Sequence, residues 1–245
     1  MWYYIFKYIL LGPILQAIGR PRVEGLDNIP DDGPVILASN HQAVFDSFYL
    51  VLVVKRRITF LAKSEYFTGR GPKGRFQRWF FSSAGQVPID RTGASAAQDA
   101  LDAGLRVLGD GKLLGIYPEG TRSPDVRLYK GKTGLARLAL ESGVPVIPVA
   151  MIGTAKMNPI GSRFPRPAKV GVKIGKPLDF SRYEGMAGNR FVERAVTDEV
   201  MYELMKLSGQ QYVDVYAASM KETPTVAVDP APPTEAARIP DTRAG

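Results

Sequence analysis

Residues 35–46 have the sequence Val-Ile-Leu-Ala-Ser-Asn-His-Gln-Ala-Val-Phe-Asp, which predicts a strand, a turn and the start of a helix. The uninterrupted apolar run at 35–39 is typical of a strand buried on both faces of a sheet. Asn40 favours a turn, and a helix is expected from about residue 45 to 54. His41, the only histidine of the chain, is therefore expected at the carboxyl end of a strand, where open α/β sheets usually bind ligands.

The spacing of His41 and Asp46 allows their side chains to meet across this turn. On one continuous helix, residues five apart point about 140° away from each other. If His41 lies in the turn and Asp46 in the first turn of the helix, the carboxylate can orient the imidazole and stabilise its protonated form. The pair is a candidate general base, and the alternative is a histidine with a purely structural role.

Strand-like and helix-like segments alternate along the rest of the chain. The strands are expected at 58–63, 86–90, 113–117, 144–153 and 168–175, and the helices at 74–85, 94–111, 134–143 and within 187–209. This alternation predicts an α/β fold with a mixed, largely parallel sheet flanked by helices. The proline-rich composition from about Lys221 onward predicts that 221–245 form a disordered tail, which leaves 21–220 as the α/β domain.

Residues 1–20 are nearly all apolar and are interrupted at Gly12-Pro13. The run is too short for a transmembrane helix, which needs roughly 20 apolar residues. Two short helices would suit an apolar helical membrane anchor that lies in the bilayer interface, a depth that Trp2, Tyr3 and Tyr4 favour. The alternative is a helix pair packed into the core of the domain.

The net charge of +8 predicts an anionic partner, which can be a nucleic acid, a phosphorylated metabolite or an anionic membrane. Plain solubility is the alternative. Basic and aromatic residues are interleaved between 55 and 81, a pattern that suits a membrane surface and would also suit single-stranded nucleic acid. The alternative is a solvated helix face whose aromatic side packs in the core. The absence of cysteine excludes disulfides and thiol nucleophiles and, with a single histidine, disfavours a zinc site, so no metal is expected.

Three further segments carry candidate chemistry: Gly85-Gln86-Val87-Pro88-Ile89-Asp90-Arg91, Pro118-Glu119-Gly120-Thr121-Arg122-Ser123 and Val144-Pro145-Val146-Ile147-Pro148-Val149. The guanidinium fork of Arg122 matches phosphate oxygens, and Gly120 permits close approach of the backbone. The Glu119 carboxylate is a candidate to orient Arg122 or a substrate hydroxyl. The third segment is also consistent with a simple core strand.

Two other motifs are incomplete. Gly131-Lys132-Thr133 resembles the end of a P-loop, but Val126 occupies the place of the leading glycine, so no phosphate cradle is predicted there. The chain contains no Gly-x-Ser-x-Gly motif, which argues against a serine hydrolase.

The His-x4-Asp pair and the three segments, in this order and spacing, resemble the glycerolipid acyltransferase family that includes 1-acylglycerol-3-phosphate O-acyltransferases. The resemblance covers about residues 20 to 180, and Tyr117 stands where the family usually has phenylalanine. It implies transfer of a fatty acyl group from acyl-CoA or acyl carrier protein, without a further cofactor, to the free hydroxyl of lysophosphatidic acid. The product would be phosphatidic acid.

By the same resemblance, His41 removes the hydroxyl proton and Asp46 holds His41. The residues expected at the acceptor phosphate are Lys63, Arg91, Glu119, Gly120, Thr121 and Arg122. The expected location is peripheral or monotopic on the cytoplasmic face of the cell membrane, with the phospholipid surface as partner and no nucleic acid. Two alternatives remain open: another acceptor, such as glycerol 3-phosphate or a different lysophospholipid, or a non-catalytic basic module that binds membranes.

Overall fold

The computed structural model of the 245-residue chain describes residues 2–90, 95–162 and 164–222. Its main feature is a seven-stranded sheet in the order β1-β8-β7-β2-β5-β3-β4. The strands are β1 (Arg22–Glu24), β2 (Val35–Ser39), β3 (Ile58–Lys63), β4 (Val87–Ile89), β5 (Leu113–Ile116), β7 (Val146–Ile152) and β8 (Gly171–Ile174). All neighbours are parallel except β7 and β8, so the predicted mixed, largely parallel sheet is confirmed.

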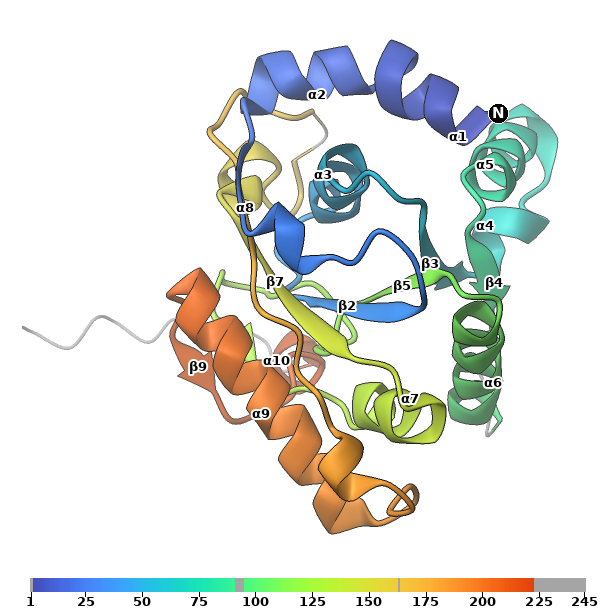
Figure 1. The fold of residues 1–245 in the computed structure, drawn as a ribbon. Helices are drawn as coiled ribbons and strands as arrows, with labels where there is room; N and C mark the ends of the chain where they lie inside the picture. The colour runs from blue at the N-terminus through green and yellow to red at the C-terminus, as the bar shows by residue number, and fades with distance from the viewer. Residues whose placement is uncertain (1, 91–94, 163, 223–245) are drawn as a thin grey trace, which may run out of the picture.

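Helices cover both faces of the sheet (Figure 1). The main ones are α2 (Gly12–Gly19), α3 (Phe45–Val53), α5 (Gly71–Ser83), α6 (Ala96–Gly109), α7 (Gly134–Ser142) and α9 (Arg190–Ser208). Short helices are α4 (Glu65–Thr68), α8 (Thr154–Met157) and α10 (Ser219–Glu222), with 3₁₀ turns at Leu26–Asn28 and Ser181–Tyr183. The helices expected from the sequence are therefore present, although α5 begins earlier than predicted.

The central strand β2 divides the core into two layers. Val35 and Leu37 pack in the layer that contains α2 and α3. Ile36 and Ala38 point the other way, into the layer that contains α6, α7 and α9. Every residue of β2 is buried, which explains why the strand is an unbroken apolar run rather than an alternating one. The carboxyl end of this doubly covered strand is the starting point of the candidate site.

The N-terminal segment lies along the outer side of α3 and reaches α5 (Figure 1). It consists of α1 (Trp2–Ile5), a π-helical turn η1 (Phe6–Leu10) and α2, so the predicted interruption near Gly12-Pro13 is present. One face packs on the domain through Tyr3 and Leu15, while Ile9 and Ile14 are 67% and 58% exposed. No helix within the described ranges combines the length and apolarity that crossing a bilayer requires. The membrane anchor therefore stays a prediction.

Lys7 is the polar exception in this segment. Its ammonium is buried and donates a hydrogen bond to the carbonyl oxygen of Val54, the residue that ends α3. A cation at this position complements the negative end of the helix dipole. Burial lowers the pKa of Lys7 to about 8.

Short elements escaped the sequence analysis. They include β1 and a separate two-stranded parallel sheet of β6 (Leu128–Tyr129) and β9 (Tyr212–Val213). α10 (Ser219–Glu222) overlaps the first two residues of the predicted tail 221–245, and the tail itself stays a prediction. Residues 223–245 lie outside the described part of the chain.

Candidate active site

His41 and Asp46 meet as their spacing predicted. His41 lies in the turn between β2 and α3, and Asp46 lies in the first turn of α3. The imidazole Nδ1–H donates to Asp46 Oδ2 over 2.9 Å. This assignment of the proton follows from the carboxylate partner and leaves Nε2 as an acceptor. The imidazole is 18% exposed and the Asp46 side chain is fully buried. A histidine in this state can accept a proton at Nε2.

The Asp46 carboxylate also closes the turn itself. Its Oδ2 atom accepts the backbone N–H groups of Gln42 at 2.6 Å and Ala43 at 2.8 Å, in addition to the imidazole. A carboxylate at the N-terminus of a helix is favoured by the helix dipole. One oxygen therefore fixes both the conformation of the turn and the orientation of the imidazole.

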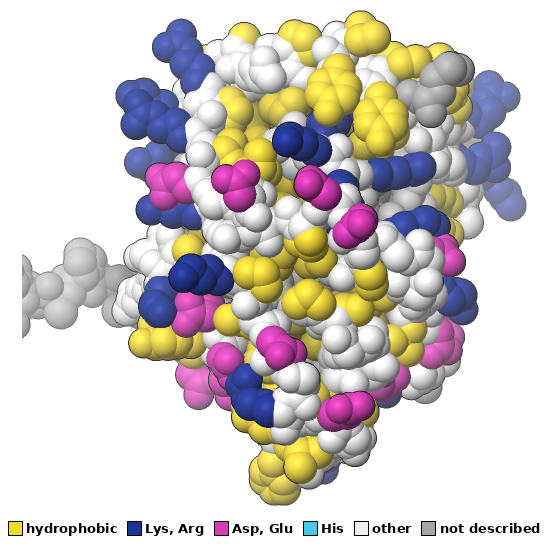
Figure 2. Space-filling model, in the orientation of Figure 1, with side chains coloured by type: hydrophobic (Ala, Val, Ile, Leu, Met, Phe, Trp, Pro, Cys, Tyr) yellow, Lys and Arg dark blue, Asp and Glu magenta, His cyan; other side chains and the backbone are white. Residues whose placement is uncertain are grey.

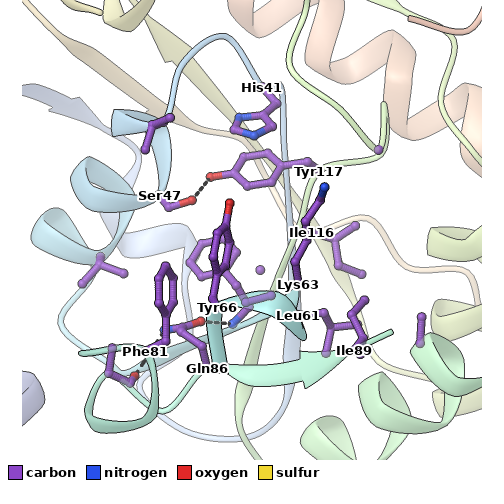
Figure 3. Close-up of a pocket in the computed structure, with 18 of the residues that line it drawn as sticks. His41, Ser47, Leu61, Lys63, Tyr66, Phe81, Gln86, Ile89, Ile116 and Tyr117 are labelled. Carbon is purple, nitrogen blue, oxygen red and sulfur yellow. Dashed lines mark hydrogen bonds between the residues drawn. The ribbon is translucent and has the colours of Figure 1, made fainter. Parts of the chain in front are cut away.

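Tyr117 forms the wall beneath the imidazole (Figure 3). The two rings are stacked with centroids 3.9 Å apart and an interplanar angle of 13°. The Tyr117 hydroxyl is 2.6 Å from Ser47 Oγ. Burial, followed by the nearby negative charge of Asp46, raises the pKa of Tyr117 well above its usual range. Tyr117, at the position of the phenylalanine expected from the resemblance, thus adds a neutral hydroxyl that pairs with the Ser47 hydroxyl in the cavity wall.

Glu119 has a different place from the one that the sequence suggested. Its side chain is 1% exposed. Its Oε1 accepts the backbone N–H of His41 at 3.0 Å, and its Oε2 accepts the backbone N–H of Tyr129 in β6 at 2.9 Å. Both carboxylate oxygens therefore bind the backbone, and Glu119 does not line the cavity described next. The geometry makes Glu119 a positioning residue for the histidine turn.

A cavity of about 1240 Å³ opens beside His41. Drug-sized ligand pockets are typically about 300–1,000 Å³, so this volume suits a larger ligand. Its apolar part runs between the N-terminal segment, α3 and α5, and is lined by Tyr3, Phe6, Leu11, Leu15, Phe48, Val51, Leu52, Phe80 and Phe81. Its polar part contains His41 and several cationic side chains. The cavity thus combines apolar and cationic lining.

Four predicted phosphate residues line this polar part: Lys63, Gly120, Thr121 and Arg122. Figure 3 shows the Lys63 side chain extending from β3 toward the level of Tyr117. Arg91, the remaining candidate, lies outside the described residues. The sequence therefore identified four residues that the fold brings together beside His41.

Lys132 was missed as a site residue. It lines the same cavity, and its backbone N–H donates to the Pro118 carbonyl oxygen over 2.8 Å. Gly120 has φ +73°, and a Cβ at that position would lie 3.1 Å from Lys132 Cε. The available signal is the Gly131-Lys132-Thr133 sequence, which lacks the rest of a P-loop. Without such a loop, it still supplies a cation over Gly120.

The comparison with protein families is decisive at this point. The family model described as Acyltransferase matches residues 20–152, more than half of the chain. This chain belongs to the acyltransferase family. The matched range of the acyltransferase model contains the His41–Asp46 pair together with Lys63, Arg122 and Lys132, and the resemblance inferred from the motifs is confirmed.

Known acyltransferases extend this result. The chain is 34% identical over 162 residues to the chloroplastic 1-acyl-sn-glycerol-3-phosphate acyltransferase of Arabidopsis thaliana, which is 65% of this chain and 44% of that protein. It is 27% identical over 177 residues to the 1-acyl-sn-glycerol-3-phosphate acyltransferase of Bacillus subtilis, or 71% of this chain and 82% of that protein. The chain thus spans less than half the length of the plant relative.

A solved structure agrees with the fold. The crystal structure of the 1-acyl-sn-glycerophosphate (LPA) acyltransferase PlsC from Thermotoga maritima matches with a TM-score of 0.59 and 27% sequence identity. The match covers 82% of this chain and 81% of that chain. The similarity therefore extends beyond the residues that the family model covers.

Proposed function

We propose that this protein transfers a fatty acyl group from a thioester donor, acyl-CoA or acyl carrier protein, to the free hydroxyl of lysophosphatidic acid. The observation that carries the proposal is the His41–Asp46 pair, whose imidazole lines a cavity that has both apolar and cationic side chains in its wall. A lysophospholipid likewise combines an apolar chain with an anionic phosphate. The names of the relatives, all 1-acyl-sn-glycerol-3-phosphate acyltransferases, support the choice of acceptor.

In the proposed reaction, His41 Nε2 accepts the proton of the acceptor hydroxyl, and Asp46 stabilises the imidazolium. The oxygen attacks the thioester carbonyl, a carbon–oxygen bond forms, and the carbonyl electron pair moves to oxygen. When the tetrahedral intermediate collapses, the carbon–sulfur bond breaks and the imidazolium returns its proton to the leaving thiolate. A general base of this kind typically contributes about 10²–10⁴ in rate.

The basic pocket would hold the acceptor phosphate. Arg122 offers a planar fork for two phosphate oxygens, and Lys63 and Lys132 add positive charge. Gly120 leaves room for a phosphate to approach the backbone, with the Thr121 side chain beside it. These contacts favour a phosphorylated acceptor but are compatible with glycerol 3-phosphate or another lysophospholipid.

A panel of acceptors tests this proposal. The purified protein is offered lysophosphatidic acid, glycerol 3-phosphate and lysophosphatidylcholine, each with one labelled acyl-CoA and one labelled acyl carrier protein. We expect acylation of lysophosphatidic acid, and a His41→Ala variant that loses about 10²–10⁴ in turnover yet still binds anionic vesicles. Equal turnover by the variant would refute the role of His41. Vesicle binding without acylation of any acceptor would favour the non-catalytic membrane module.

We further propose that the N-terminal segment rests on the membrane surface. Figure 2 shows apolar side chains over the part of the molecule where Figure 1 places α1 and α2, with Lys and Arg at both flanks. Exposed apolar residues there include Trp2, Tyr4, Tyr8, Ile9, Leu10 and Ile14. Apolar contact combined with basic flanks is the usual requirement for binding an anionic interface. The cytoplasmic face of the cell membrane is the proposed location.

Point substitutions test the surface better than deletion, because Tyr3 and Leu15 of the same segment also line the cavity. The double variant Ile9→Ser, Ile14→Ser should weaken binding to anionic vesicles while the unfolding temperature remains close to that of the parent. Met186→Ser is the control, since Met186 is 47% exposed in the segment between the 3₁₀ turn at 181–183 and α9. If the parent, the double variant and Met186→Ser bind vesicles equally well, Ile9 and Ile14 of the N-terminal segment do not contribute to the membrane contact.

A further inference from the structure

The residue before His41 is tied to the C-terminal part of the chain. Asn40 is fully buried at the end of β2. Its side-chain oxygen accepts the Met151 N–H at 2.7 Å, and its Nδ2 group donates to the Met151 carbonyl oxygen at 3.0 Å. These two bonds join Asn40 to the adjacent strand β7. The second Nδ2 proton goes to Gln210 Oε1 at 2.6 Å, and Gln210 lies outside the sheet.

Gln210 is itself held in place. Gly209, with φ +67°, ends α9 in the left-handed conformation and turns the chain. Gln210 Nε2 then donates to the carbonyl oxygen of Val126, and Gln210 N–H donates to Ser208 Oγ over 3.2 Å. Val126 has φ +73°, an unusual conformation for a β-branched residue. The side chain of Gln210 therefore bridges two distant loops, one of which contains the histidine.

A second connection runs from the same segment to the same turn. Two residues after Gln210, β9 begins and pairs in parallel with β6. Tyr129 of β6 donates its N–H to Glu119, whose other oxygen accepts the N–H of His41. The segment that follows α9 thus contacts Asn40 directly and supports His41 through β6 and Glu119.

We infer that Gln210 and β9 (Tyr212–Val213) act as a clamp on the catalytic turn and that Gln210 is a positioning residue for His41. The inference rests on the proposed function, since it requires His41 to be the base. The clamp lies outside the range matched by the family model, which ends at residue 152. Without the Gln210 oxygen, a buried N–H of Asn40 loses its partner, and the turn must shift for Asn40 to find another. A shift of about 1 Å at a reacting group can cost about 10²-fold in rate.

Three variants separate the contacts. Gln210→Ala removes both side-chain bonds, whereas Gln210→Glu keeps an oxygen for Asn40 and removes the donor to Val126. Gln211→Ala is the matched control, because Gln211 is the exposed neighbour. We expect Gln210→Ala to lower kcat about 10- to 100-fold with little change in the acceptor KM, and Gln210→Glu to recover most of the loss. Wild-type kcat in Gln210→Ala, or a Gln210→Glu variant as slow as Gln210→Ala, would overturn the inference.

A second readout does not depend on turnover. His41 is the only histidine in the chain, so its imidazole NMR signals need no assignment. Gln210→Ala should shift or broaden the Nδ1–H resonance of the bond to Asp46, and Gln211→Ala should leave it unchanged. An unchanged resonance in Gln210→Ala would refute the clamp even if the proposed reaction is correct. If the parent protein acylates no acceptor but the resonance still shifts in Gln210→Ala, the clamp is supported and the proposed function is refuted.

Discussion

Replacing Glu119 by glutamine should destabilise the protein although the two side chains have nearly the same shape. Both carboxylate oxygens accept backbone N–H groups, from His41 and from Tyr129. Glutamine has one acceptor oxygen, so its NH₂ group would face one of these N–H donors. One buried N–H donor stays unpaired, which costs about 1–3 kcal/mol, and the remaining hydrogen bond is weakened by about 1 kcal/mol because its acceptor is no longer charged. The lower cost of burying a neutral side chain offsets part of this, so we expect a loss of about 2 kcal/mol in the free energy of unfolding.

Equilibrium unfolding in urea gives this difference directly, and initial acylation rates show whether the turn has moved. Glu203→Gln is the control, because Glu203 pairs with Lys206 on the surface of α9 and should change the free energy of unfolding by less than about 0.5 kcal/mol. We expect kcat of Glu119→Gln to fall together with stability. If its stability stays within about 1 kcal/mol of the parent while the acceptor KM rises, Glu119 contacts the substrate and the positioning role is wrong.

Three further substitutions have defined outcomes. Gly120→Ala places a Cβ at φ +73° against the Lys132 side chain. It should lower the free energy of unfolding by about 1–2 kcal/mol and raise the KM of a phosphorylated acceptor. An unchanged KM would contradict the phosphate site. Burial lowers the pKa of Lys7 from 10.5 to about 8. Between pH 8 and 10.5 the unfolded chain therefore binds more protons than the folded one. The free energy of unfolding should rise with pH over this range, by up to about 3 kcal/mol. Lys7→Met should flatten that rise, measured by urea unfolding at several pH values. Tyr117→Phe removes the bond to Ser47 and should cost about 1 kcal/mol with little change in kcat; a large fall in kcat would give the hydroxyl a part in the reaction.

The parts of the site that the sequence predicts are those with a local signal. The apolar run of β2 and the five-residue spacing of His41 and Asp46 lie within twelve consecutive residues, and both appear as expected. Gly120, Thr121 and Arg122 likewise lie in the loop that follows a strand, four to six residues after the end of β5 at Ile116. In each case, the geometry of one strand and its turn is sufficient to place the side chains.

The parts that the sequence does not predict depend on distant partners. Glu119 lies three residues before Arg122 in the chain, but its carboxylate binds backbone N–H groups. Every residue except proline has such a group, so the amino-acid sequence does not show which ones Glu119 binds. The strands β6 and β9 have two residues each, too few for any periodicity, and they pair across more than eighty positions. Gln210 follows a surface helix and carries no motif. The contact of Gln210 with Asn40 depends on where α9 ends, which only the folded structure shows.

Two buried carboxylates supply the hydrogen bonds that the histidine turn lacks. The turn belongs to neither a strand nor a helix, so its backbone N–H groups need other partners. Glu119 accepts the N–H of His41, and Asp46 accepts those of Gln42 and Ala43. Asp46 therefore holds the turn and, in the proposed reaction, also stabilises the imidazolium of His41.

This double role determines which substitution at Asp46 is informative. Asp46→Ala removes both roles, so loss of activity in that variant cannot be assigned to the charge. Asp46→Asn retains an oxygen that can accept the same three N–H groups. It removes the charge and puts an NH₂ group in place of Oδ1, a buried atom without a hydrogen-bond partner among the described residues. At an effective dielectric constant of about 20, a charge about 4 Å from the imidazolium contributes about 4 kcal/mol, or about 10³ in rate. A stable Asp46→Asn protein with nearly wild-type kcat would show that the carboxylate acts by holding the turn alone.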